Sequence, residues 1–107
     1  MSLQVASISL ELIASLRPLV PRIRRHDRSL ADQLVRAASS VALNIGEADY
    51  SDPGTMKARF FTAAGSANET RCALRVAVAW GYLKDADVEA PAELADRVMA
   101  MLWKLTR

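Results

Sequence analysis

Apolar residues recur along this chain every three to four positions, which is the spacing of one face of an α-helix. The pattern predicts four amphipathic helices, at about residues 3–20, 29–47, 53–80 and 91–106. No stretch shows the apolar–polar alternation between turn residues that is typical of a half-buried β-strand. The prediction is therefore an all-α fold, an up-down-up-down antiparallel four-helix bundle that occupies residues 1–107 as a single domain.

Proline and small polar residues predict where the first two helices end and begin. Pro18 and Pro21 are expected to kink or end the first helix, because proline lacks a backbone N–H and crowds the carbonyl four residues earlier. An arginine-rich connector follows, and Ser29 is the expected N-cap of the second helix.

The later boundaries have their own markers. Asp52 is expected to cap the third helix, with Pro53 in its first turn, where a missing N–H costs nothing. Gly81 should end that helix in the left-handed conformation, with the next two residues folding back onto its last turn. An acidic loop is expected next, and Pro91 should open the fourth helix.

Three of the predicted helices also carry apolar residues on the side that a lone bundle would leave in water. These are Val35 and Leu43 in the second helix, Val76 and Trp80 in the third, and Trp103 in the fourth. Apolar groups on adjoining helices form a patch, and such patches mark interfaces. We therefore expect a homo-oligomer that forms through these residues. The alternative is that the second and third helices are simply the central pair of one bundle.

Composition agrees with a folded, cytoplasmic chain. Of 107 residues, 51% are hydrophobic and 24% are charged, which is ordinary for a globular domain. The single cysteine, Cys72, excludes an internal disulfide and is expected to be a buried structural thiol. No apolar run approaches the roughly 20 residues of a membrane span, and the N-terminus lacks the basic segment of a signal peptide.

The positive charge is concentrated near the N-terminus. Residues 1–36 hold six arginines against three acidic residues, although the whole chain carries a formal charge of only +2. Guanidinium groups suit phosphate oxygens, and such contacts are largely indifferent to base sequence. The candidate nucleic-acid-binding residues are Arg17, Arg22, Arg24, Arg25, Arg28 and Arg36. The alternative is an ordinary solvated face, with Asp27 and the acidic loops as ion-pair partners.

No aromatic residue is interleaved with these arginines along the chain, so sequence reading on a single strand is not indicated. Catalytic chemistry is not indicated either. The only histidine, His26, lies in the arginine-rich connector without the partners of a triad. The chain has neither the Glu-x-x-His motifs of a di-iron bundle nor a glycine-rich phosphate loop. We expect no catalytic residue, no metal and no cofactor.

Polar residues beside the apolar stripes form a predicted seam between helices. Its members are Gln33, Ser40, Asn44, Glu47, Glu69 and Arg71. We interpret them as interhelical hydrogen bonds and ion pairs that set the register of the helices. The alternative is a polar pocket for a small ligand around Asn44, Glu47 and Glu69, which would make the protein an enzyme or a ligand-binding protein.

Three spaced motifs resemble those of the 23S rRNA intervening-sequence protein family. They are QLVRAA at residues 33–38, SVALNIGEA at 40–48 and AAGSANE at 63–69, followed by GY at 81–82. Ala48 stands where the family usually has glycine, and Trp80 stands where it usually has leucine. The likeness covers most of the chain.

This resemblance implies a four-helix bundle without known enzymatic activity. Related proteins assemble as rings of five subunits, and one branch serves as the accessory protein of the reverse transcriptase in diversity-generating retroelements. The expected partners are other copies of the chain, RNA or DNA, and a protein such as a reverse transcriptase, with no membrane. The leading hypothesis is a non-enzymatic oligomer that binds nucleic acid through its arginine-rich end. The alternative is a scaffold that docks an acidic or polymerase partner without touching nucleic acid.

Overall fold

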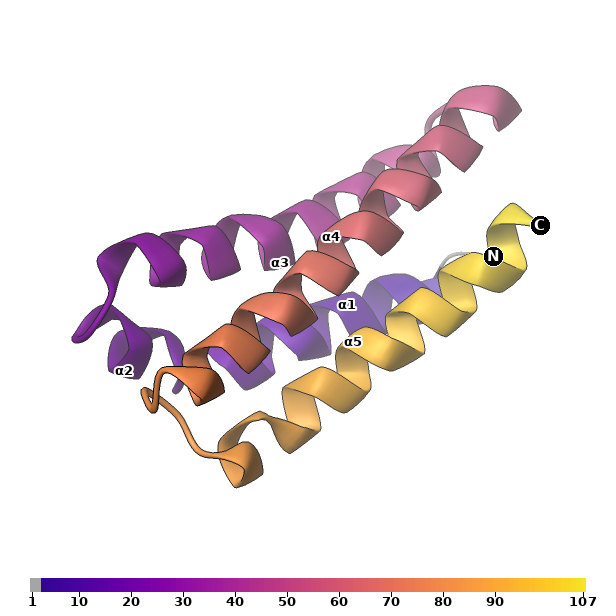
Figure 1. Ribbon diagram of the computed structural model, residues 1–107. Helices are drawn as coiled ribbons and strands as arrows, with labels where there is room; N and C mark the ends of the chain where they lie inside the picture. The colour runs from indigo at the N-terminus through magenta and orange to yellow at the C-terminus, as the bar shows by residue number, and fades with distance from the viewer. Residues whose placement is uncertain (1–2) are drawn as a thin grey trace.

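The computed structural model describes residues 3–107, which form four long helices and one short helix. They are α1 (Leu3–Leu16), α2 (Val20–Arg24), α3 (Arg28–Ala48), α4 (Pro53–Ala79) and α5 (Asp85–Thr106). Successive long helices run in opposite directions along the molecule (Figure 1), and no strand occurs among the residues described. The predicted all-α, helical-bundle fold is confirmed.

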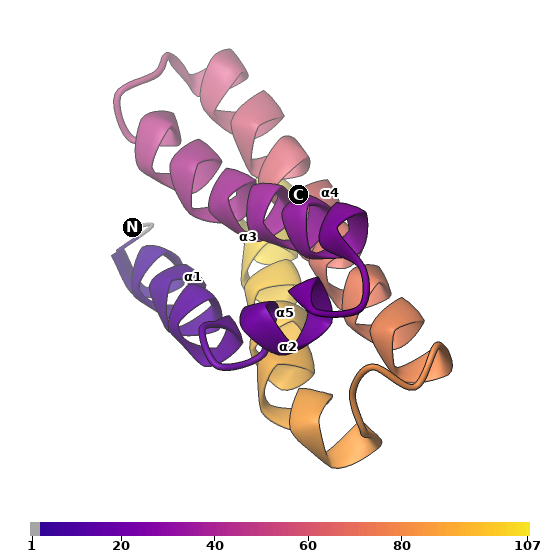
Figure 2. The ribbon, with the colours of Figure 1, turned by 90° about the vertical axis from the view of Figure 1, so that its left-hand side faces the viewer.

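Each long helix packs against two others, in the circular order α1, α3, α4, α5. The short helix α2 lies against α3 at one end of the bundle. We call this end, formed by α2, the start of α3 and the α4–α5 turn, the arginine end; it faces the viewer in Figure 2. The α3–α4 turn, the start of α1 and the end of α5 lie at the opposite end, which we call the far end (Figure 1).

The predicted apolar stripes supply the core, which forms two clusters along the length of the bundle. Large members of the cluster nearer the arginine end are Leu12, Leu16, Ile23, Leu34 and Leu74. Large members of the other cluster are Val5, Val41, Ile45, Phe60 and Leu102. Because both clusters draw on several helices, the core holds the connectors at each end in fixed positions.

The helix expected at residues 3–20 is interrupted. α1 ends at Leu16, and after a short turn the chain resumes as α2, with Pro21 in its first turn. The next helix begins at Arg28, one residue before the expected cap. Asp27 caps it instead of Ser29, because its extended backbone lets a carboxylate oxygen accept a hydrogen bond from the backbone N–H of Leu30 at 2.9 Å.

The acidic segment expected to be a loop is the first turn of α5, which starts at Asp85 rather than at Pro91. The carboxylate of Asp87 accepts a hydrogen bond from the backbone N–H of Lys84 at 2.8 Å. Acidic side chains in the first turn also interact favourably with the positive end of the helix dipole. Pro91 lies buried inside the helix. A proline there removes one backbone hydrogen bond but, as this helix illustrates, does not require a new start.

The boundaries of α4 agree with the sequence markers. Asp52 accepts a hydrogen bond from the backbone N–H of Thr55 at 2.9 Å, and Pro53 is the first helical residue. Gly81 has a φ of 81°, in the left-handed region that favours glycine. This conformation turns the chain back, and the N–H of Tyr82 donates to the carbonyl of Ala77 at 2.9 Å.

Candidate nucleic-acid interface

The arginine end is built on α2, a helix of one and a half turns that is held by its apolar side. Ile23 is fully buried, and Leu19 just before the helix is buried as well. Since these two residues face the core, the polar residues between and after them face outward. The result is a basic rim made of α2 and the first turns of α3.

Two of the six candidate arginines are held by acidic neighbours. The guanidinium of Arg22 donates to both carboxylate oxygens of Asp87, at 3.2 and 2.9 Å, and so joins α2 to the start of α5. This bidentate contact is the main cause that lowers the pKa of Asp87, followed by the hydrogen bond from the backbone of Lys84. Arg24 donates to Asp32 at 3.0 Å on the surface.

The other four candidates are exposed and unpaired. Among residues 3–107, Arg17, Arg25, Arg28 and Arg36 make no hydrogen bond or ion pair through their guanidinium groups. The solvated-face alternative assigned Asp27 and the acidic loops as partners. Asp87 of the acidic segment does pair with Arg22, whereas the carboxylate of Asp27 caps α3. These four groups therefore remain available to an anion from outside the chain.

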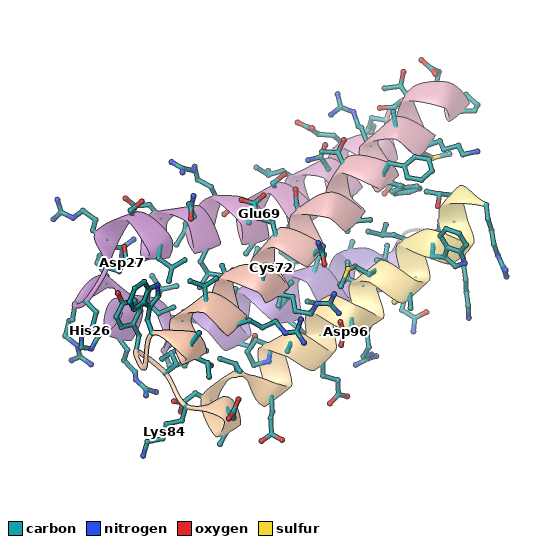
Figure 3. The ribbon with its side chains drawn as sticks, viewed as in Figure 1. His26, Asp27, Glu69, Cys72, Lys84 and Asp96 are labelled. Carbon is teal, nitrogen blue, oxygen red and sulfur yellow. The ribbon has the colours of Figure 1, made fainter. Side chains whose placement is uncertain are left out.

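Three aromatic rings gather at the same end, a feature that the linear sequence conceals. His26 stacks on Tyr82, with ring centroids 5.0 Å apart and planes within 2° of parallel. Tyr82 also stacks with Trp80, at 6.5 Å and 16°. Figure 3 shows His26 in the α2–α3 connector, on the same side of the molecule as Lys84 of the α4–α5 turn. The only sequence signal for this arrangement was Gly81, which predicted that Tyr82 would fold back.

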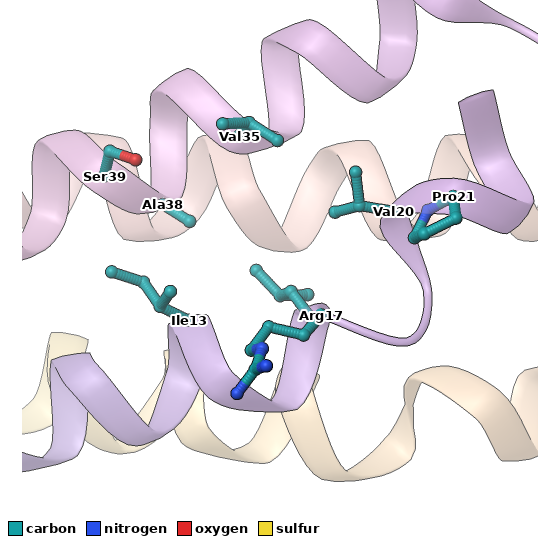
Figure 4. Close-up of a pocket in the computed structure, with 8 residues that line it drawn as sticks. Ile13, Arg17, Val20, Pro21, Val35, Ala38 and Ser39 are labelled. Carbon is teal, nitrogen blue, oxygen red and sulfur yellow. The ribbon is translucent and has the colours of Figure 1, made fainter.

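An apolar groove lies between α1 and α3, next to the arginine end (Figure 4). Its volume is about 330 Å³, and its walls include Ile13, Leu16, Val20 and Val35. Arg17 is one of its few polar lining residues. Apolar surface thus continues from the basic rim onto the side of the bundle.

Three residues of the predicted polar seam make hydrogen bonds within the α3–α4 pair. The hydroxyl groups of Ser40 and Ser66 lie 2.8 Å apart and join α3 to α4. The amide of Asn44 donates to the backbone carbonyl and hydroxyl of Ser40, at 2.9 and 3.1 Å. Glu47 accepts from Arg59 at 2.7 Å.

The other three predicted seam residues differ in burial and in their hydrogen-bond partners. Arg71, half-buried on α4, donates to Asp96 of α5 at 2.6 Å. Gln33 and Glu69 are exposed and make no side-chain contact with another described polar group, so they are not part of the seam. Of the three residues of the alternative ligand pocket, Glu47 lines a surface pocket of about 550 Å³ with Tyr50 and Arg59, whereas Asn44 bonds to Ser40 and Glu69 is exposed on α4.

All five residues predicted to form the oligomer interface are exposed, with exposed fractions from 40% for Val35 to 69% for Trp80. The central-pair alternative is therefore wrong, since α3 and α4 keep apolar side chains in water. The sequence prediction missed three further exposed residues, Leu10, Tyr50 and Phe61. The predicted five do not form one patch, because Trp80 follows α4 at the arginine end and Trp103 lies in the last turns of α5.

The expectation that Cys72 is a buried thiol is wrong. Cys72 is exposed on the outer side of α4, while its neighbours Ala73 and Leu74 point into the core. In the part of the chain that the structure describes, no three His, Cys, Asp or Glu side chains gather as metal ligands. None of the helices described is both long and apolar enough to span a bilayer.

Comparisons with known proteins agree with the motifs. The sequence model of a family described as 23S rRNA-intervening sequence protein matches residues 1–104. The fold is similar to that of a crystal structure from Bacteroides thetaiotaomicron, a protein of unknown function from the S23 ribosomal protein family. The TM-score is 0.89 at 20% identity, over 96% of this chain and 98% of that chain. No curated protein sequence matches the chain.

Proposed function

The chain belongs to the 23S rRNA-intervening sequence protein family, and we propose that it is a non-enzymatic, self-associating helical bundle that binds the nucleic-acid backbone through its arginine end. The observation that carries this proposal is the presence of four unpaired guanidinium groups: Arg17, Arg25 and Arg28 in the segments that flank α2, and Arg36 further along α3. Unpaired cations on a fixed surface attract phosphates and release the counterions that surround them.

The two paired arginines have a different role in this proposal. Arg22 bridges α2 and α5 through Asp87, so it positions the basic rim. Arg24 forms an ion pair with Asp32, which partly neutralises its charge. We expect substitution of Arg22 to act through the position of α2, and substitution of the four unpaired arginines to act directly on affinity.

Self-association would multiply the effect of each weak contact. We propose a ring of five copies, in which Val35, Leu43, Val76 and Trp103 meet neighbouring copies. Their exposure on three helices supports a subunit contact between different faces, and such contacts form a ring when the rotation from copy to copy closes. Several basic rims on one particle would bind one nucleic-acid chain far more tightly than a single rim does.

The test is fluorescence anisotropy with a labelled single-stranded RNA at increasing salt. We expect binding at low salt and a steep loss as salt rises. Replacing Arg17, Arg25, Arg28 and Arg36 by Ala should reduce the slope of log K against log salt by about three, at roughly 0.7 per lost phosphate contact. The control replaces Lys57, Arg97, Lys104 and Arg107, which removes the same charge elsewhere. Absence of binding at low salt, or equal slopes for the two variants, would contradict the proposal.

The competing function is a scaffold that docks an acidic protein through the same four arginines. Nuclease treatment separates the two functions. Partners recovered by affinity purification should disappear after digestion if nucleic acid links them, and should persist if they bind the protein directly. Light scattering tests the assembly separately, because a chain of 11.7 kDa that stays monomeric at high concentration cannot form a ring.

A further inference from the structure

We propose that the arginine end is specific for single-stranded nucleic acid, because an unpaired base stacks on the indole of Trp80 while the neighbouring guanidinium groups hold its phosphates. This inference rests on the proposed function and deepens it. A basic rim alone gives no preference for a single strand, because a duplex has the higher charge density, whereas an exposed aromatic face accepts only a base that has left its pair.

The rings form a fixed platform. Tyr82 is partly buried and packs against the core cluster nearer the arginine end, so its plane is held by the fold. His26 covers part of Tyr82 at 5.0 Å, and Trp80 stacks with Tyr82 at 6.5 Å. Trp80 itself is 69% exposed. An aromatic ring that is both held and exposed loses little freedom when a base stacks on it.

The α2–α3 and α4–α5 connectors, which hold these rings, also carry basic side chains. His26 directly follows Arg25 and lies two residues before Arg28, and both arginines are unpaired. Lys84 lies two residues after Tyr82 and is exposed. Stacking rings next to cations that follow the backbone are the two components of single-strand binding surfaces that do not read sequence. The nucleotide sugar is not distinguished by these groups, so RNA and DNA are both included.

Trp80 therefore has a different assignment from the other exposed apolar residues. The sequence predicts it with Trp103 in the subunit interface, but Trp80 stacks with Tyr82, on which His26 of the arginine-rich connector also stacks. Trp103 has a similar exposure, 63%, and stacks with no ring among residues 3–107. The two tryptophans are matched in chemistry and exposure and differ in surroundings.

The experiment compares Trp80→Ala with Trp103→Ala in anisotropy titrations at low salt. The probes are a labelled RNA of about 12 nucleotides without secondary structure, DNA of the same sequence, and the corresponding duplex. We expect Trp80→Ala to weaken single-strand binding roughly 5- to 100-fold, with little effect on the duplex, and Trp80→Phe to restore most of the loss. Trp103→Ala acts through assembly and should change all three affinities by a common factor, so that the ratio of single-strand to duplex affinity stays within about twofold of the wild type.

A second measurement follows the ring itself. In Trp103→Phe, Trp80 is the only indole, so its fluorescence should be quenched by the unlabelled single strand and not by the duplex. Equal affinities for Trp80→Ala and the wild type, or a loss of assembly by light scattering in Trp80→Ala, would overturn this inference. If the four-arginine variant still binds as tightly as the wild type, the proposed function itself fails.

Discussion

The two ends of the bundle contain similar residues in different surroundings. Each carries an exposed tryptophan, Trp80 or Trp103, and each has basic side chains close by in sequence. At the arginine end, two connectors meet, so that rings and cations from distant parts of the chain lie together. Trp103 instead belongs to a single helix. Exposure and residue type alone therefore do not distinguish the two tryptophans, whereas the second connector beside Trp80 does.

The means of anchoring differ as well. The arginine end is tied by the buried Ile23 and by the bidentate contact between Arg22 and Asp87, which joins segments 65 residues apart. The far end is closed by the α3–α4 turn, where Asp52 caps α4 and Glu47 pairs with Arg59, only 12 residues along the chain. The proposed binding surface is assembled from two segments, so we expect it to depend on these anchors.

The largest effect is expected from two matched core substitutions, Ile23→Ala and Ile45→Ala. Both side chains are fully buried, one in each core cluster, so each variant should lose about 2–5 kcal/mol of unfolding free energy. Only Ile23→Ala should also weaken RNA binding under conditions where the protein remains folded, because α2 carries the basic rim. Urea unfolding and anisotropy measure the two quantities, and equal losses of affinity would argue against the anchoring role of α2.

An intermediate effect is expected at two glycines. Gly81→Ala forces a side chain into the left-handed region, which should cost about 1–2 kcal/mol and displace Trp80 and Tyr82 from each other. Gly46→Ala is the control at the other end of the molecule, in a helix with open space around the new methyl group. It should raise stability by about 0.5–1 kcal/mol. A Gly81→Ala variant with unchanged stability and unchanged Trp80 fluorescence would show that this turn does not hold the ring.

The smallest effect concerns two carboxylates with lowered pKa values. Arg22 is the main cause for Asp87, and the backbone N–H of Thr55 is the main cause for Asp52. A lowered folded pKa means that the unfolded chain binds the proton first, so stability falls as the pH drops through the ordinary value near 3.8 and onward through the folded values. Asp87→Asn and Asp52→Asn should each flatten this fall in acid urea titrations. A profile identical to the wild type would exclude that carboxylate as a contributor.

Helical periodicity was sufficient to predict the four long helices and their buried stripes. Sequence-based prediction was wrong where the same local residues are compatible with two structures. Acidic residues before Pro91 suggest a loop, but they also suit the first turn of a helix, and that is where they lie. The apolar neighbours of Cys72 predict a buried thiol, but Cys72 is exposed. The candidate site was predicted in its arginines but not in its aromatic rings. Contacts such as that between His26 and Tyr82 join residues 56 positions apart, and no local pattern encodes them.

Photo-cross-linking of a 4-thiouridine-labelled single strand tests the central claim most directly. Trypsin cleavage after Arg75 and Lys84 releases residues 76–84 with Trp80 and Tyr82, while cleavage after Arg97 and Lys104 releases residues 98–104 with Trp103. Binding at the arginine end predicts that the nucleotide mass is attached mainly to residues 76–84 and to the connector around His26. Cross-links concentrated on residues 98–104, or spread evenly over the chain, would contradict it.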